Sequence, residues 1–249
     1  MKKIYYSWII GYPKQEYQSL VYPWYEDFKK AGPFPEDFFK PLLKSIENYN
    51  QEYQHFKCPA FQEWNRNMWT VKQPFDITFA YLKEAKKIIH SQLGDGFKDF
   101  FLLHEPTKNT NHQEAQFAYQ ILFWTEEKNI WIEIYPHPEL SRLNLDLVPG
   151  TFSISDWTRP VSFGFKILEP EKEIILKKNT SLYYIKFLSK SNPNDNFILE
   201  NKNASDDLLA KLNKDISLKF YNKNESWRLM KSRSDKSEKK CPFFHFFKK

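Results

Sequence analysis

Glycine is scarce in this sequence, with 6 residues among 249, whereas an average protein contains about 7% glycine. Phosphate-binding loops need several glycines at fixed spacing, because only a backbone without side chains can approach a phosphate closely. Neither the GxxxxGKS or GxxxxGKT pattern of a P-loop nor the GxGxxG pattern of a dinucleotide-binding unit occurs. The sequence therefore gives no support to either class of nucleotide-binding protein.

Cysteine is rare as well, and long hydrophobic runs are missing. Cys58 and Cys241 are too few for a disulfide framework and fit a reducing compartment. No run approaches the roughly 20 apolar residues of a membrane span. The apolar run near the start stops at Gly11 without a cleavage site of small residues, so no signal peptide is predicted. The expected location is the cytoplasm.

Aromatic residues, in contrast, make up 18% of the chain. Such side chains favour the pleated surface of a strand, and short apolar runs separated by turn residues recur from residue 99 onward. The predicted strands are Phe100–His104, Phe117–Thr125, Ile130–Tyr135, Phe152–Ile154, Val161–Leu168, Glu173–Leu176, Leu182–Leu188 and Phe197–Leu199. Short strands at this regular spacing predict a mainly β protein (α+β by content) with an antiparallel β-sandwich or jelly-roll-like core.

Helices are predicted on both sides of this β core. Asp37 to Tyr53 has apolar residues at helical spacing, and residues 82–93 have helical composition, although Phe75–Phe79 before them alternates like a strand. Asp206 to Tyr221 is predicted to be a closing helix that begins after Ser205 as its N-cap. The predicted organisation is one globular domain over residues 1–222, followed by a basic aromatic tail at 223–249. Within the domain, a mixed helical and irregular part at 1–98 begins with a strand at 3–10. The β core at 99–204 and the closing helix at 205–222 follow it.

Two stretches, residues 149–167 and 174–187, carry a likeness to known sequences, and residues 57–61 and 71–77 add to it. Its most specific piece is the W-x-R-P segment at residues 157–160. These stretches resemble a family of uncharacterised proteins from marine bacteriophages and some bacteria. The family has a glycine where Asn179 stands. The resemblance implies a phage origin, with the host cytoplasm or the virus particle as the location, and it implies no activity.

The W-x-R-P segment also contains the predicted binding residues, Trp157 and Arg159. The guanidinium group of Arg159 is a planar fork that suits a carboxylate or a phosphate. In the structural alternative, Trp157 packs in the core, and Arg159 stacks on an aromatic ring or pairs with Asp156. The sequence leaves both interpretations open.

A metal site is the second candidate, formed by His112, Glu114 and His137. A His-x-Glu pair with a distant histidine matches the facial ligand set of non-haem iron oxygenases, whose cofactor is Fe(II). Against this interpretation, residues 109–114 have the composition of an exposed loop, and no cofactor is expected otherwise. No GxSxG motif identifies a nucleophile.

The C-terminal tail contains the excess positive charge. Residues 223–249 have nine Lys and Arg against three Asp and Glu, which equals the net charge of +6 of the whole chain, so residues 1–222 are neutral overall. The tail is predicted to contact a partner through the side chains interleaved with these charges: Trp227, Cys241, Phe243, Phe244, Phe246 and Phe247. Nucleic acid, bound through its phosphates and by stacking, is the alternative partner.

Together these features predict a non-catalytic interaction or structural protein of phage type, with a β-sandwich core and a C-terminal arm that docks on a protein partner or on a second copy. A jelly-roll iron oxygenase or small-molecule-binding protein is the first alternative. A nucleic-acid-binding accessory factor is the second. No membrane association is expected.

Overall fold

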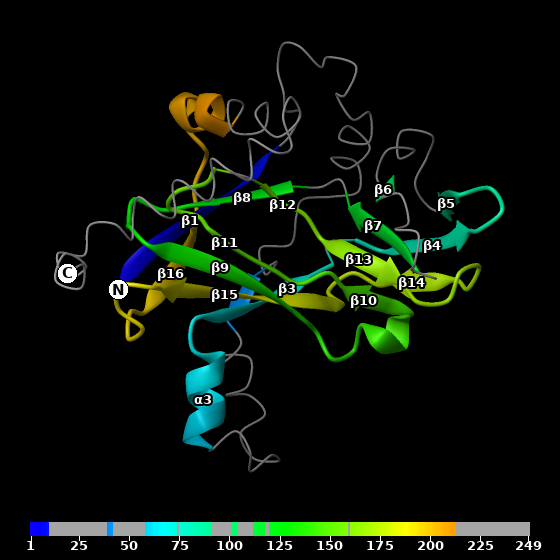
Figure 1. The fold of residues 1–249 in the computed structure, drawn as a ribbon, viewed down its shortest axis with the longest axis horizontal. Coiled ribbons are helices and arrows are strands. Elements are labelled where there is room, and N and C mark those ends of the chain that lie inside the picture. Colours follow the sequence, from blue (N-terminus) through cyan, green and yellow to red (C-terminus); the bar gives the residue numbers. More distant parts are fainter. Residues whose placement is uncertain are drawn as a thin grey trace, which may run out of the picture.

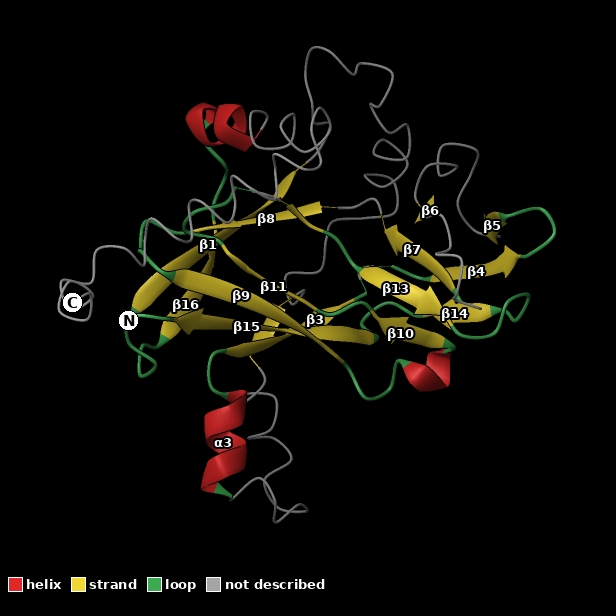
Figure 2. Ribbon diagram, viewed as in Figure 1, coloured by secondary structure: helices red, strands yellow, loops and turns green. Residues whose placement is uncertain are grey.

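A computed structural model describes residues 1–9, 39–41, 58–73, 75–90, 101–103, 112–117, 120–158 and 160–212. This part of the protein is mostly β, as predicted, and consists of several largely antiparallel sheets that pack against each other (Figure 1, Figure 2). Within these ranges, no helix combines the length and the apolar character that a membrane span requires.

The largest sheet has five strands, and all its neighbouring pairs are antiparallel. In order across the sheet they are β11 (Gly150–Ser153), β9 (Ile130–Pro136), β15 (Ser181–Ser189), β3 (Met68–Lys72) and β2 (Phe39–Pro41). A second sheet contains, in order, β12 (Pro160–Val161), β8 (Gln120–Trp124), β1 (Lys2–Ile9) and β16 (Phe197–Asn201).

Two smaller antiparallel sheets complete the described strands. One contains β10 (Leu145–Leu147), β13 (Gly164–Ile167), β7 (Gln113–Phe117) and β6 (Phe101–Leu103), and the other contains β14 (Ile174–Leu176), β4 (Ile77–Leu82) and β5 (Lys87–His90). The helical elements are α3 (Pro59–Asn65), the short 3-10 helix η4 (Ser141–Leu143) and residues 206–212.

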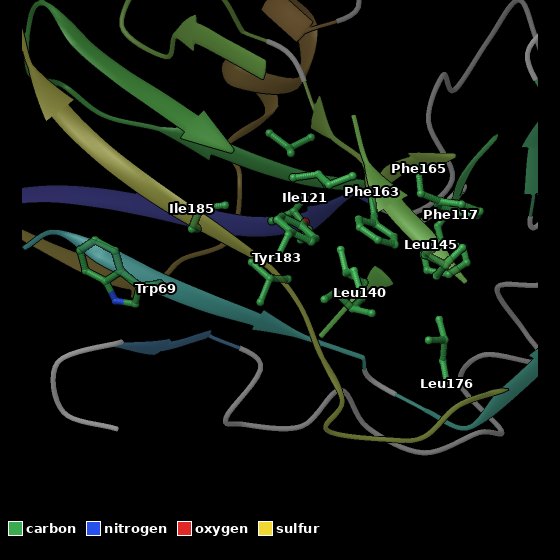
Figure 3. Packing of buried hydrophobic residues seen from close by; sticks show 14 of the residues in the cluster. Trp69, Phe117, Ile121, Leu140, Leu145, Phe163, Phe165, Leu176, Tyr183 and Ile185 are labelled. Carbon is green, nitrogen blue, oxygen red and sulfur yellow. The ribbon is translucent and has the colours of Figure 1, made fainter. Parts of the chain in front are cut away.

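One hydrophobic core joins the sheets, and aromatic rings from several strands meet in it (Figure 3). Phe79 of β4 lies 4.7 Å from Phe101 of β6, measured between ring centroids, and Phe117 of β7 lies 5.1 Å from Phe165 of β13. All four rings are buried. Such rings bury a large apolar area each and prefer the tilted arrangements seen here. This core explains why the chain contains so many phenylalanines.

Strand β1 connects segments that are far apart in the sequence. It pairs in parallel with β16, with Lys2 opposite Phe197, and antiparallel with β8, with Tyr6 opposite Phe123. The predicted strand at residues 3–10 is therefore confirmed as β1, but its parallel partner was not predictable from local pattern. The mixed helical and irregular character expected for residues 1–98 does not hold where this part is described, because it supplies β1 to β5 as well as α3.

The helix expected at residues 82–93 is wrong at residues 82–90, and residues 91–93 lie outside the described residues. Strand β4 continues to Leu82, residues 83–86 form a turn with Lys86 at a φ of 46°, and β5 returns from Lys87. The register places Ala80 opposite Ile89. Lys, Glu and Ala suit a helix intrinsically, but pairing along β4 outweighs that weak preference. The helix expected from Asp37 to Tyr53 is likewise wrong at Phe39–Pro41, which forms β2; the rest of that range lies outside the described residues.

Two predicted strands are each divided in the structure. The one expected at Phe117–Thr125 corresponds to the end of β7 and to β8, which belong to different sheets. The one expected at Val161–Leu168 corresponds to β12 and β13, which also belong to different sheets. An apolar run does not indicate where the chain passes from one sheet to another, so the sequence pattern predicted one long strand where the structure has two.

Local signals at chain reversals were more reliable. The Ser205 hydroxyl accepts a hydrogen bond from the backbone N–H of Leu208 at 3.3 Å, which confirms the predicted N-cap. The helix predicted from Asp206 to Tyr221 is present at 206–212, and residues 213–221 lie outside the described residues. Asn179 has a φ of 69° in the turn between β14 and β15. Asparagine and glycine are the residues that adopt this left-handed conformation most readily.

Candidate functional site

The predicted binding segment is only partly described. The half-buried ring of Trp157 packs edge-on against Phe152 of β11, with 5.8 Å between ring centroids. Asp156 accepts a hydrogen bond from the Ser153 hydroxyl at 2.7 Å. Arg159 lies outside the described residues. The packing of Trp157 agrees with the structural alternative, and its role in binding stays a prediction.

The three predicted metal ligands lie on different sheets. His112 and Glu114 are at the start of β7, with Glu114 opposite Lys166 of β13, whereas His137 follows β9 of the five-stranded sheet. The imidazole ring of His137 packs against Tyr184, with 5.0 Å between centroids. Among the described residues, which include all three, no group of three or more His, Cys, Asp or Glu side chains is arranged to hold a metal ion.

The tail residues predicted to contact a partner, Trp227, Cys241, Phe243, Phe244, Phe246 and Phe247, lie outside the described residues. Cys58 is described, and it is an exposed free thiol that immediately precedes α3.

A different group of side chains gathers on the outer side of the five-stranded sheet. Strand β9 buries Ile130 and Ile132 in the core, so alternation turns Trp131, Glu133 and Tyr135 to the opposite face, where they are half-buried. Figure 1 shows β9 beside β15 along the body of the molecule. We call this surface the aromatic face and define it by Trp64, Trp131, Tyr135, His137 and Tyr184 together with Glu133, Lys186 and Lys190.

Cross-strand register aligns the aromatic face in rows. Tyr135 of β9 is directly opposite Tyr184 of β15, and Glu133 is opposite Lys186. Directly opposed side chains on one face of an antiparallel pair are close enough to contact each other. The Tyr135 hydroxyl donates a hydrogen bond to the Glu133 carboxylate within the same strand. The result is a ring pair beside a pair of opposite charges.

Helix α3 adds a tryptophan to this face. The Lys186 ammonium donates a hydrogen bond to the Trp64 backbone oxygen at 2.6 Å, and the Trp64 ring lies 6.0 Å from the Tyr135 ring. The Trp64 side chain is nevertheless 47% exposed. Figure 2 shows α3 standing away from the strands. A large apolar ring is thus held at the edge of the face while much of it stays in contact with solvent.

The chain after α3 fixes the position of that helix. Arg66 ends the helix, and its guanidinium donates hydrogen bonds to Glu63 at 2.5 Å and to the Pro193 backbone oxygen at 2.8 Å. The Asn67 side-chain amide donates to the Asp195 backbone oxygen at 2.7 Å, and its oxygen accepts from the Phe197 N–H at 3.1 Å. These bonds connect the short helix to a turn more than 120 residues away and therefore position Trp64.

At the other end of the face, a lysine covers a tryptophan. The Lys190 ammonium lies 3.6 Å above the centroid of the Trp131 ring. A cation over an indole face is attracted by the quadrupole of the ring. Lys190 also donates its backbone N–H to Asn129, whose φ is 59°, so the turn that reverses the chain after Lys128 helps to place it.

Several titratable groups of the aromatic face have displaced pKa values. Burial, together with the hydrogen bond to Glu133 and its charge, raises the pKa of Tyr135 to about 12. Burial lowers the pKa of Lys186 and of His137 and raises that of Tyr184. Clusters of displaced pKa values are more frequent at functional surfaces than elsewhere. Each shift here favours the uncharged form of the side chain, and an uncharged side chain is more easily covered by a partner surface of mixed apolar and polar character.

The sequence alone contained part of this site. The strand predicted at Ile130–Tyr135 is confirmed as β9. The signal missed was that the outward positions of β9 and β15 are aromatic rather than merely polar. The contribution of Trp64 had no signal, because it depends on contacts between α3 and strands far away in the sequence.

No protein-family model and no curated protein matches this sequence. Among solved structures, a native EIAV dUTPase is similar with a TM-score of 0.30 and 9% identity, over 52% of this chain and 81% of that one. A mutant dUTPase of Staphylococcus bacteriophage 80alpha, with dUpNHpp, is similar with a TM-score of 0.26 and 6% identity, over 42% of this chain and 85% of that one. Similarities this low carry no argument about what this chain binds.

Proposed function

We propose that this chain is a non-catalytic interaction protein of the phage type suggested by the sequence resemblance, and that it binds a protein partner through the aromatic face. The C-terminal arm at residues 223–249 is a second contact in this proposal. The single observation that carries it is the half-buried row of aromatic side chains on β9 and β15, with Trp64 exposed beside it. Trp and Tyr are enriched at protein interfaces and often dominate their affinity.

Charge on the aromatic face favours a protein partner over nucleic acid. Lys186 is hydrogen-bonded to α3 and lies opposite Glu133, and Lys190 lies on Trp131. Arg66 pairs with Glu63 at 2.5 Å. Binding to nucleic acid depends on several unpaired cations that neutralise phosphates. A face whose cations already have partners, and which alternates rings with opposite charges, has the mixed character of a protein interface.

The test uses the full chain with Trp64→Ala and Trp131→Ala as variants of the face. Leu103→Ala is the matched control, since Leu103 is an exposed apolar residue of β6, which belongs to another sheet. A protein that co-purifies with the tagged chain is then expressed and purified separately. Calorimetry measures the dissociation constant of its complex with the wild type and with each variant. Loss of a central interface tryptophan is expected to weaken binding by about tenfold or more, whereas Leu103→Ala leaves it unchanged.

Two results would overturn the proposal. One is equal affinity of the captured protein for the wild type and for both tryptophan variants. The other is tight binding of single-stranded DNA that weakens steeply with salt and disappears when residues 223–249 are removed, which would assign the chain to nucleic-acid-binding proteins instead. The first result, combined with loss of protein binding when residues 223–249 are removed, would show that the arm alone forms the interface.

A further inference from the structure

Strand β14 is the outer strand of a three-stranded sheet. It pairs with β4, with Ile175 opposite Thr78, and among the described strands no other pairs with it. Its side chains alternate sharply: Ile174 and Leu176 are buried in the core, whereas Ile175 is 46% exposed. Ile175 is therefore one of the few large apolar side chains that the described part of the molecule presents to solvent.

Charged residues flank Ile175 symmetrically on the same side of the strand. Glu173 lies two positions before it and Lys177 two positions after it, and both are exposed. Glu173 and Lys177 lie immediately outside the bounds of β14, and burial alternates from exposed to buried through residues 173–177. This alternation indicates that an acid, an isoleucine and a base follow one another on the solvent-facing side of the segment. Reversing the direction of this row exchanges the acid and the base and leaves the isoleucine in the middle.

This pattern is complementary to itself. A two-fold axis between β14 and its copy, at a right angle to the sheet, pairs the two strands edge to edge and antiparallel. Ile175 then lies beside its own copy, and Glu173 of each molecule lies opposite Lys177 of the other. An interface around a two-fold axis uses the same patch on both molecules, so a patch must complement its own reversed image. Opposite charges that face each other across two antiparallel strands stabilise the pair, and like charges destabilise it.

We propose that a second copy of this chain pairs antiparallel with the edge of β14 that no described strand occupies, with the two-fold axis beside Ile175. Exposed outer strands are sites where chains associate unless charge or shape prevents it. Here the charges do not repel a second copy, because acid meets base on both sides of the axis. This inference is independent of the aromatic face, which lies on another sheet.

The intramolecular surroundings leave both charges available. Glu173 has no ion pair with any described residue. The Lys177 ammonium lies 3.6 Å from the Asp76 carboxylate, and both side chains are more than half exposed. An exposed pair of this kind contributes little to stability. A carboxylate of the second copy can therefore join this pair without displacing a strong interaction.

The experiment is a charge exchange in the full chain, with the dimer constant measured by sedimentation equilibrium. Glu173→Lys puts two lysines opposite each other on both sides of the axis, and Lys177→Glu does the same with two glutamates. Each single variant is expected to weaken the dimer roughly fivefold or more, since two attractive pairs become repulsive. The double variant Glu173→Lys with Lys177→Glu restores opposite charges at both contacts, so its dimer constant returns toward that of the wild type.

Lys3→Glu is the matched control. Lys3 is also an exposed strand lysine with one carboxylate partner, Glu200 at 2.9 Å, and its strand β1 lies at the opposite end of the molecule from β14 (Figure 1). This variant is expected to dimerise like the wild type, and circular dichroism checks that all four variants are folded. A monomeric wild type, single variants that dimerise normally, or a double variant that dimerises no better than the single ones would each overturn the proposal.

Discussion

Asn144 combines a backbone and a side-chain role at one buried position. Its φ is 62°, in the left-handed region, and its side chain is almost completely buried. The amide nitrogen donates to the Glu169 backbone oxygen at 2.8 Å, and the amide oxygen accepts from the Glu169 N–H at 2.7 Å. One side chain thus satisfies both backbone groups of a residue in the turn that leads to β14.

Replacing Asn144 by alanine is expected to lower the free energy of unfolding by about 2–4 kcal/mol, because two backbone groups lose their partners and alanine adopts the left-handed region less readily than asparagine. Asn144→Gly loses the same hydrogen bonds but tolerates the backbone, so its loss is expected to be about 1 kcal/mol smaller. Urea unfolding measures both. Equal losses for the two variants would show that the backbone conformation contributes nothing.

Tyr183 presents the opposite situation, a buried polar group without a partner. Its ring stacks on Phe163 at 5.2 Å with an interplanar angle of 4°, and its hydroxyl has no hydrogen-bond partner among the described residues. Burial raises the pKa of this phenol. Burial of a hydroxyl without a hydrogen-bond partner lowers the stability of the fold, and the ring stack does not depend on that hydroxyl.

Tyr183→Phe is therefore expected to raise the free energy of unfolding by about 1 kcal/mol, with the ring stack retained. Thermal and urea unfolding would detect the gain, and Tyr184→Phe, which removes a half-buried hydroxyl from the neighbouring position, serves as the comparison. A clear loss of stability in Tyr183→Phe would contradict the prediction and indicate that an internal water binds the hydroxyl.

At the scale of elements, a histidine beside the β9–β15 pair makes the stability of the aromatic face depend on pH. His137 lies just beyond β9 against Tyr184, and its Nδ1 atom accepts a hydrogen bond from the Glu139 N–H at 3.2 Å, which only an unprotonated Nδ1 can do. Burial lowers the pKa of His137, and the charge of Glu139 offsets part of this effect. The hydrogen bond and the lowered pKa both favour the neutral form of this histidine in the folded protein.

Acidification is expected to destabilise the protein through His137. Its folded pKa is below the ordinary value of 6.5, so as pH falls below that value the unfolded chain binds a proton that the folded chain does not, and the free energy of unfolding decreases. We expect His137→Gln to lose less stability than the wild type between about pH 7.5 and about pH 5.5. The other five histidines are common to both proteins. Identical pH dependence in urea unfolding would refute this role.

At the scale of the whole molecule, the strand at the beginning of the described chain is paired with the last one. Lys2 lies opposite Phe197 in the parallel β1–β16 pair, and the Lys2 ammonium forms an ion pair with Asp195 at 2.8 Å. The Lys202 N–H donates to the Tyr6 backbone oxygen at 3.0 Å. Strand β1 also separates β16 from β8, so its sheet cannot remain continuous without it.

Deleting residues 2–9 is therefore expected to abolish the single cooperative unfolding transition, because β8 and β16 lose their shared neighbour and Ile4 leaves the core. Urea unfolding followed by far-ultraviolet circular dichroism and by tryptophan fluorescence checks this. The control is Lys3→Glu, which keeps the strand and changes only an exposed pair. A truncated chain that still unfolds in one sharp transition would show that β1 is dispensable.

The sequence predicted those features of the fold that depend on residues close together in the chain. Strands β9, β15 and β16 were predicted almost to their ends, because alternation and turn residues are local properties. The N-cap at Ser205 is equally local. The hairpin at residues 77–90 was mistaken in part for a helix, since Lys, Glu and Ala are compatible with both states until β4 supplies a partner. Of the aromatic face, the sequence predicted the two strands that carry it, β9 and β15, but not the contribution of Trp64.

The amino-acid sequence by itself determined that this protein is mainly β and which side chains of each regular strand share a face, because these follow from the period of two along an extended chain. Only the tertiary structure decided which strands are neighbours, that β1 lies beside β16, and that Trp64 lies over Tyr135. Such contacts join residues tens to hundreds of positions apart. Which of these contacts form depends on how the whole core packs, and no short segment of the sequence contains that information.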